Sequence, residues 1–225
     1  MNPTTLTVYA SPYPKERIGK KFDGGYMIVN IPNKKYTMLL AGGVGNDLSF
    51  ESDFCRKFNV QCFAYDGTIT NAPPADARVK WVNENIVAGS FRNDISTGKA
   101  GDFFLKMDIE GYEIPWLESM TSDELAKFGQ IVMEFHSPFS ERHGAVFEKL
   151  NRTHALVHFH ANNCCGTRIH GGVQIPNIFE CTYVLRNLLP ESLALNTDTI
   201  PSPLDQRNLG HIPEISINWP PFVHQ

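Results

Sequence analysis

The chain has 225 residues, of which 42% are hydrophobic and 20% charged, so it can bury a core without needing disulfides or a structural metal. Its net charge of −4, without any block of five or more Lys or Arg, argues against binding to duplex nucleic acid. The longest apolar run, Met38 to Gly45, is far shorter than the roughly 18 residues of a membrane span. The first residues, MNPTTLTVYASPYP, lack an export signal, so we expect a cytoplasmic location.

The N-terminal 35 residues are predicted to form an extension ahead of the main fold. Asp23-Gly24-Gly25 is a turn signal between two extended pieces that together cover residues 17–29. We expect this hairpin to lie over an edge of the sheet.

Residues 36–187 alternate short apolar runs with helical patterns, which is typical of an α/β fold with a mostly parallel sheet and helices on both faces. Helices are predicted to begin near Phe50, at Pro115 and at the capping box Thr121–Glu124, with Gly129 as a helix stop, and another helix surrounds Val146. The predicted strands, seven in number, are 36–41, 61–65, 79–82, 102–107, 130–135, 155–159 and 178–185.

The remaining segment, 188–225, is rich in proline and is predicted to be an irregular tail. Six of the fifteen prolines lie from Pro190 onward. We expect Ile215, Ile217 and Trp219 to pack the tail on the core, so that residues 1–225 form a single domain.

The five cysteines include no C-x-x-C pair, which favours reduced thiols over a disulfide framework or a zinc site. The adjacent Cys164 and Cys165 follow His160 and Asn162, which leaves a role in a site open. The sequence does not indicate an oligomeric state.

The first predicted strand ends in a glycine turn formed by Gly42, Gly43 and Gly45. Such a turn lets the backbone and the following helix N-terminus approach a ligand closely. Leu48 stands where the dinucleotide fingerprint needs a third glycine, whereas Asp66 ends the next strand, where an acid meets ribose hydroxyls in nucleoside-binding folds. Together these features favour a cofactor that contains a nucleoside.

A second group of polar residues follows the fourth and fifth predicted strands. Asp108 ends one strand, and Glu134 and His136 share a face at the end of the next. Such a group suits either proton transfer or a divalent ion. His158 and His160 also share a face on the sixth strand, where core or supporting roles are favoured.

In order and spacing, four motifs resemble the FkbM-type S-adenosylmethionine-dependent methyltransferases, and the likeness spans about residues 15 to 187. The D-x-E-G-x-E run is its most specific element. The four motifs are Gly43-Val-Gly45-Asn-Asp47-Leu-Ser49-Phe50-Glu51, Asp66-Gly67, Lys106-Met-Asp108-Ile-Glu110-Gly111-Tyr-Glu113 and Glu134-Phe-His136. Arg17-Ile-Gly, Asp23-Gly-Gly-Tyr26 and Phe179-Glu-Cys-Thr-Tyr183 also look like this group.

The resemblance implies a Rossmann-like class I methyltransferase fold, with a seven-stranded sheet whose last strand is antiparallel, and S-adenosylmethionine as cofactor. It places the methionine part of the cofactor on the amides around Gly43 and Gly45, its ribose on Asp66, and its adenine near Glu84 to Ile86. It also makes a sugar or glycan hydroxyl the expected acceptor. The expected cofactor-binding residues are Asp23, Tyr26, Gly42, Gly43, Gly45, Asp47, Ser49, Asp66, Gly67, Asn85, Asp108 and Glu110.

Two schemes could remove the proton of such a hydroxyl. Either His136 or Asp108 accepts it while Glu134 orients its neighbour, or Asp108, Glu134 and His136 hold a divalent ion that lowers the hydroxyl pKa. The acceptor pocket is expected from loops 87–100, 137–145 and 161–176. Methylation of a non-sugar small molecule remains an alternative, as do, with less support, a NAD-dependent oxidoreductase and a non-catalytic nucleoside-binding module.

Overall fold

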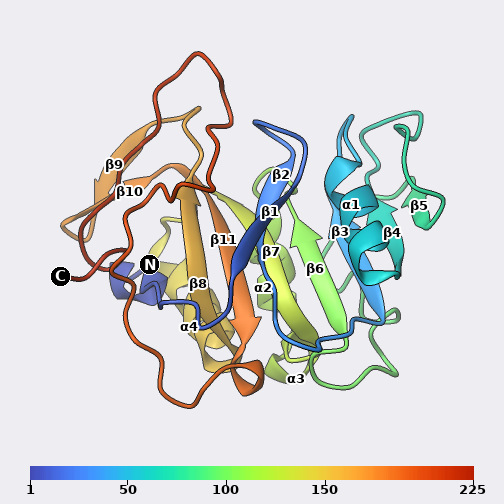
Figure 1. Ribbon diagram of the computed structural model, residues 1–225, viewed down its shortest axis with the longest axis horizontal. Coiled ribbons are helices and arrows are strands. Elements are labelled where there is room, and N and C mark those ends of the chain that lie inside the picture. Colours follow the sequence, from blue (N-terminus) through green and yellow to red (C-terminus); the bar gives the residue numbers. More distant parts are fainter.

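The computed structural model describes all 225 residues, and its centre is a seven-stranded sheet with the order β5-β4-β3-β6-β7-β11-β8 (Figure 1). β11 is antiparallel to both of its neighbours, and every other pairing is parallel. The predicted α/β sheet with a reversed last strand is therefore confirmed. Its strands are β3 (Met38–Gly42), β4 (Gln61–Tyr65), β5 (Val79–Val82), β6 (Phe103–Met107), β7 (Phe128–His136), β8 (His154–Ala161) and β11 (Ile178–Leu185).

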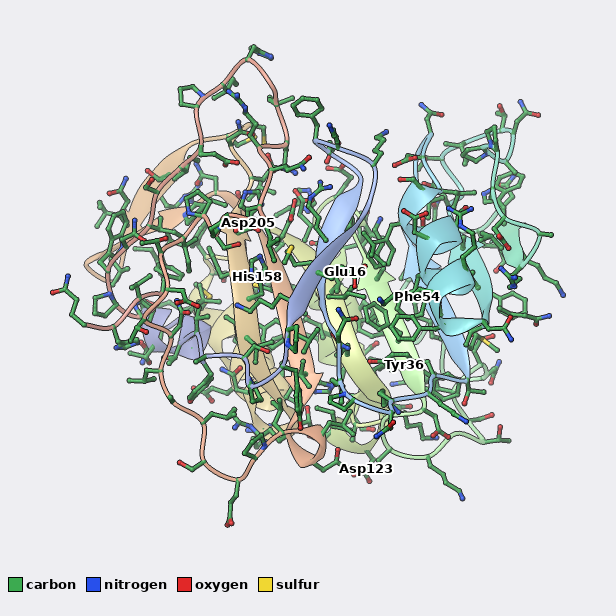
Figure 2. All side chains as sticks on the ribbon, in the orientation of Figure 1. Glu16, Tyr36, Phe54, Asp123, His158 and Asp205 are labelled. Carbon is green, nitrogen blue, oxygen red and sulfur yellow. The ribbon has the colours of Figure 1, made fainter.

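Helices cover both faces of this sheet, as predicted. On one face α1 packs its aromatic residues against the strands, with the rings of Phe54 and Phe104 4.3 Å apart and Tyr36 beside them (Figure 2). On the other face Trp116 and Phe147 are fully buried in the largest apolar cluster. The helices are α1 (Ser49–Phe58), α2 (Glu113–Ser119), α3 (Ser122–Leu125) and α4 (Gly144–Thr153), and the 3-10 turns are η1 (Pro3–Leu6), η2 (Glu141–His143) and η3 (Arg186–Leu188).

Gly129 was predicted to stop a helix, and that prediction is wrong. α3 already ends at Leu125, and Gly129 lies inside β7. A Cβ atom on Gly129 would lie 2.8 Å from the carbonyl oxygen of Gly101, so the glycine permits a close backbone approach at the start of the strand.

Two of the predicted crossovers differ from a regular strand–helix alternation. The segments 66–78 and 83–102 contain turns but no helix. In the first of them the adjacent Pro73 and Pro74 cannot sit inside a helix, because proline lacks the N–H donor and clashes with the preceding turn.

The N-terminal hairpin forms as predicted from β1 (Lys15–Gly19) and β2 (Gly25–Val29), but it lies across a face of the sheet and not over its edge (Figure 1). All five residues of β2 are buried. The Thr182 hydroxyl donates to the Met27 carbonyl at 2.7 Å, and the Gln130 side chain bonds both the N–H and the carbonyl of Val29. These contacts fix the hairpin over β7 and β11.

The segment 161–176, predicted as a loop, contains a second small hairpin formed by β9 (Thr167–His170) and β10 (Val173–Pro176). Its residues are mostly exposed or half-buried, so the sequence carries little apolar alternation there.

The tail wraps around β8, the edge strand of the sheet. Asp205 bonds the ring of His158 on one face, at 2.9 Å (Figure 2), while the ring of Phe222 packs on Phe159, whose side chain points to the other face, at 4.6 Å. Near the N-terminus, the N–H of Tyr9 bonds the carbonyl of Leu156 at 2.8 Å. Both chain ends thus cover an edge that would otherwise present unpaired backbone groups. The longest helices, α1 and α4, have ten residues each, which is too short for a membrane-spanning helix.

Candidate active site

A cavity of about 670 Å³ lies at the carboxyl ends of β3, β4 and β6, beside the turn of the N-terminal hairpin. Of the twelve predicted cofactor-binding residues, nine line it: Asp23, Tyr26, Gly43, Gly45, Asp47, Asp66, Asn85, Asp108 and Glu110. Gly42, Ser49 and Gly67 lie outside the cavity wall. Gly42 is covered by Ile86, Gly67 lies behind Asn85, and the Ser49 hydroxyl bonds the backbone of Lys20.

The glycine turn lies directly against the end of β6. Gly43 has φ 69°, and a Cβ atom there would meet the carbonyl oxygen of Asp108 at 1.5 Å. Only glycine fits this position. The Nζ atom of Lys106 donates to the Gly43 carbonyl at 2.5 Å and so holds the turn from below.

Each carboxylate oxygen of Asp66 accepts two hydrogen bonds from neighbouring residues of the protein. Oδ2 accepts from the amides of Val44 and Gly45 at 3.0 and 2.8 Å, and Oδ1 accepts from the amide and hydroxyl of Thr68 at 2.8 and 2.6 Å. Burial acts to raise the pKa of Asp66, but these bonds outweigh it and lower the pKa below its ordinary value. Two amides that were expected at the methionine part of the cofactor therefore point to Asp66.

Tyr26 joins the half-buried carboxyl group of Asp108 to the buried carboxyl group of Glu134 at the inner end of the cavity. Its hydroxyl donates to Asp108 Oδ2 at 2.8 Å and lies 3.5 Å from Glu134 Oε2, while Asn162 donates to Glu134 Oε1 at 2.8 Å. Burial raises the pKa of Asp108, and burial together with the charges of Asp108 and Glu180 raises that of Glu134 well above its ordinary value. Asp108 Oδ1 has no hydrogen-bond partner.

His136 lies behind Asp108 and outside the cavity wall. Its Nδ1 is 3.0 Å from Glu113 Oε1, and its Nε2 is 3.3 Å from Glu110 and 3.9 Å from Asp108 Oδ1. Burial alone lowers the pKa of His136, but the hydrogen bond and charge of Glu113, with the two other carboxylates, raise it overall. His136 is thereby held as a neighbour of Asp108.

The predicted metal-ligand set needs correction. The ligand atoms that lie within 4.8 Å of one another belong to Asp108, Glu113 and His136, and Glu134 is not among them. Glu134 turns to Tyr26 and Asn162, whereas His136, at the last position of β7, turns to the first turn of α2. Strand alternation placed both side chains on one face but could not give their directions at the strand end.

Several residues at or beside the cavity were missed as site residues. Lys106 and Glu51 line the cavity and Glu113 lies beside His136, and all three belong to the motifs quoted above but were assigned no role. Tyr65 was also missed and forms an apolar part of the wall together with Ile86, which was expected near the adenine. Position within the motifs was the available signal for the three charged residues.

His158 and His160 lie away from the cavity and are buried against the tail. His158 bonds Asp205, and His160 lies 3.3 Å from both Glu180 and Glu214. The prediction of core or supporting roles is consistent with these contacts.

No protein-family model and no curated protein sequence matches the chain. Among solved structures, it is similar to a variant of the 16S rRNA (adenine(1408)-N(1))-methyltransferase from Catenulisporales acidiphilia, with 10% identity and a TM-score of 0.32 over 75% of this chain and 97% of that one. The sheet is defined by its own strand order.

Proposed function

We propose that the chain is an S-adenosylmethionine-dependent methyltransferase that methylates a hydroxyl group of a sugar, a glycan or another small molecule. The observation that carries the proposal is Asp108, whose half-buried carboxylate lines the cavity and is held there by the Tyr26 hydroxyl at 2.8 Å. The strand order, with its reversed seventh strand, also agrees with the fold that the resemblance implies.

The cavity fits a ligand of this class. Its volume lies within the ~300–1,000 Å³ range of small-molecule sites. Tyr65, Ile86 and Ile109 offer an apolar wall for a flat base, next to the polar side chain of Asn85. When bound, the cofactor would supply a methyl group on a positively charged sulfur, and the buried carboxylates of this wall would stabilise that charge.

Of the two candidate bases, the geometry favours Asp108. Asp108 lines the cavity whereas His136 does not, and the Tyr26 hydroxyl fixes the Oδ2 atom of Asp108. Burial raises the pKa of Asp108, which makes its carboxylate a stronger base than an ordinary aspartate. His136 is a positioning residue in this scheme, because Glu113 and Glu110 hold it outside the cavity wall.

The metal scheme fits less well. Glu113 Oε1 already accepts from the amides of Ile109 and Gly111, both at 3.1 Å, in addition to its contact with His136. A metal ion would displace bonds that fix this turn. We therefore expect methyl transfer to be unchanged after dialysis against excess chelator, as measured by the rate of S-adenosylhomocysteine formation; a loss that added Mg²⁺ restores would favour the metal scheme.

The Asp108→Asn variant tests the proposed base. We expect its turnover to fall by roughly 10²–10⁴-fold, the typical contribution of general base catalysis, with cofactor affinity little changed. The assay is mass spectrometry of a panel of glycans and small hydroxylated acceptors after incubation with cofactor. Glu118→Gln, an exposed acid on α2, serves as the control. Full turnover in Asp108→Asn would remove Asp108 as the base.

Calorimetry distinguishes the remaining functional classes. A methyltransferase binds S-adenosylmethionine and not NAD, an oxidoreductase binds NAD, and a non-catalytic module binds a nucleoside without turnover. Binding of neither cofactor would overturn the proposal.

A further inference from the structure

Two oppositely charged side chains of the cavity wall are buried without forming a salt bridge. Lys106, on β6, is 5% exposed, and Glu51, in the first turn of α1, is 1% exposed. Burying an ionised group is costly unless partners replace its water. Their hydrogen bonds therefore indicate whether either residue is satisfied within the protein.

Lys106 is only partly satisfied. Of the three N–H donors on its ammonium group, one bonds the Gly43 carbonyl, and the nitrogen also lies 5.1 Å from the centre of the Tyr26 ring. It forms no salt bridge with any carboxylate of the chain. A buried ammonium group with unspent donors on a cavity wall favours an anionic group on the ligand.

One oxygen of Glu51 lacks a hydrogen-bond donor, whereas Lys106 lacks acceptors for its remaining N–H groups. Its Oε1 is buried and has no hydrogen-bond partner. Burial raises the pKa of the Glu51 carboxyl, and the positive charge of Lys106 only partly opposes this shift. Lys106 is therefore near enough to influence Glu51 electrostatically, yet the two do not pair directly. A cationic donor from a ligand would satisfy the free oxygen.

The other charges of the wall exclude a polyanion as this ligand. The lining residues include only Lys20 and Lys106 as bases, against six acids. The acids are Asp23, Asp47, Glu51, Asp66, Asp108 and Glu110. A diphosphate would meet more repulsion than attraction, whereas a zwitterion carries one charge for each of the two unsatisfied side chains.

We propose that Lys106 and Glu51 bind the amino-acid end of the cofactor, with Lys106 on its α-carboxylate and Glu51 on its α-ammonium group. This assignment rests on the proposed function and gives that end of the cofactor side-chain partners in place of the Val44 and Gly45 amides, which Asp66 already occupies. It makes the site specific for adenosyl ligands that carry an intact amino acid.

The wild-type protein provides the first test. Calorimetry compares S-adenosylhomocysteine with 5′-methylthioadenosine, which keeps the nucleoside and sulfur but lacks both charged groups. We expect the second ligand to bind at least about tenfold more weakly, because charge-assisted bonds to two buried side chains are lost. Equal affinities would overturn the assignment while leaving the proposed function intact. If neither ligand bound, the proposed function itself would fall.

The variants Lys106→Met and Glu51→Gln provide the second test. Each variant is expected to bind S-adenosylhomocysteine roughly 10–100-fold more weakly than the wild type and to keep the Kd of 5′-methylthioadenosine within about twofold. Lys80→Met, which removes an exposed lysine on β5, is the matched charge control. Equal weakening of both ligands in the two cavity variants would contradict a role in recognising the amino acid. Circular dichroism checks folding, and the wild-type comparison decides the question if a variant does not fold.

Discussion

The carboxyl groups that line the cavity differ in how completely they are hydrogen-bonded. Asp66 accepts four bonds, whereas Asp108 and Glu51 each keep one oxygen without a partner. Native structures leave few buried polar atoms unpaired. The satisfied carboxylate therefore has a role in holding the glycine turn, and the two others keep acceptor capacity that the protein itself does not use.

Asp66→Asn tests the holding role through its pH dependence. Asparagine has a single acceptor oxygen, so the variant cannot receive all four bonds, and we expect a loss of about 1–3 kcal/mol in the free energy of unfolding at pH 7. The hydrogen bonds lower the pKa of Asp66 in the folded state. The stabilisation should therefore be complete above the unfolded pKa of about 3.9 and should disappear as the pH falls through the lower folded value.

Urea unfolding of the wild type and the variant from pH 7 to pH 3 measures this difference. Asp198→Asn, an exposed aspartate in the tail, controls for removal of a charge. A difference between wild type and Asp66→Asn that stayed constant to pH 3 would mean that the carboxylate does not hold the turn by accepting these bonds.

At the scale of elements, the sequence predicted those strands whose bounds are set by local patterns. The runs 61–65, 79–82 and 178–185 are strands with the predicted bounds, because apolar runs between turn signals mark buried strands. The prediction for Gly129 was wrong because a glycine after an apolar helical pattern usually marks the end of a helix. The glycine is needed instead because the carbonyl of Gly101, from another segment of the chain, lies close to it.

The position of the N-terminal hairpin could not be predicted for the same reason. Gln130 is fully buried in β7 and bonds both backbone groups of Val29 and the hydroxyl of Tyr36. Nothing local to Gln130 distinguishes it from a polar residue at a strand start. Its partners are about a hundred residues away in the sequence, at a separation of 101 for Val29, so the docking of the hairpin emerges only in the assembled fold.

The candidate site could likewise be predicted only in part from the sequence. Asp66 and Asp108 were identified because parallel strands end at one edge of the sheet, and both line the cavity. Side-chain directions beyond a strand end are not set by alternation, which is why Glu113, and not Glu134, lies beside His136. The positions of unsatisfied atoms on Glu51 and Lys106 depend on neighbours from other elements and required the structure.

At the scale of the whole molecule, the tail is held to the sheet by buried ionic contacts as well as by apolar packing. On the face of the hairpin, His158 meets Asp205 and His160 lies between Glu180 and Glu214. The charge of His158 lowers the pKa of Asp205 well below its ordinary value, against the opposing effect of burial. Breaking one partner of such a buried pair is more costly than losing a surface pair.

His160 makes the attachment of the tail dependent on pH. Burial alone lowers its pKa, but Glu180 and Glu214 raise it well above the ordinary value. The stabilisation from charged His160 should therefore be complete below the unfolded pKa of about 6.5 and should be lost as the pH rises through the higher folded value.

Trypsin cleavage after Arg207, an exposed residue of the tail, measures this opening. We expect the wild type to be cleaved at least about tenfold more slowly than His160→Gln at pH 6, because the tail opens less often when His160 is charged, and we expect the two rates to converge as the pH is raised towards 9. Taking the ratio of the two proteins at each pH cancels the pH dependence of the protease. His211→Gln, which removes an exposed histidine of the same tail, should behave as the wild type. A rate ratio that does not change with pH would show that the charge of His160 does not hold the tail, which would leave the apolar contacts of Phe222 and Ile217 as its attachment.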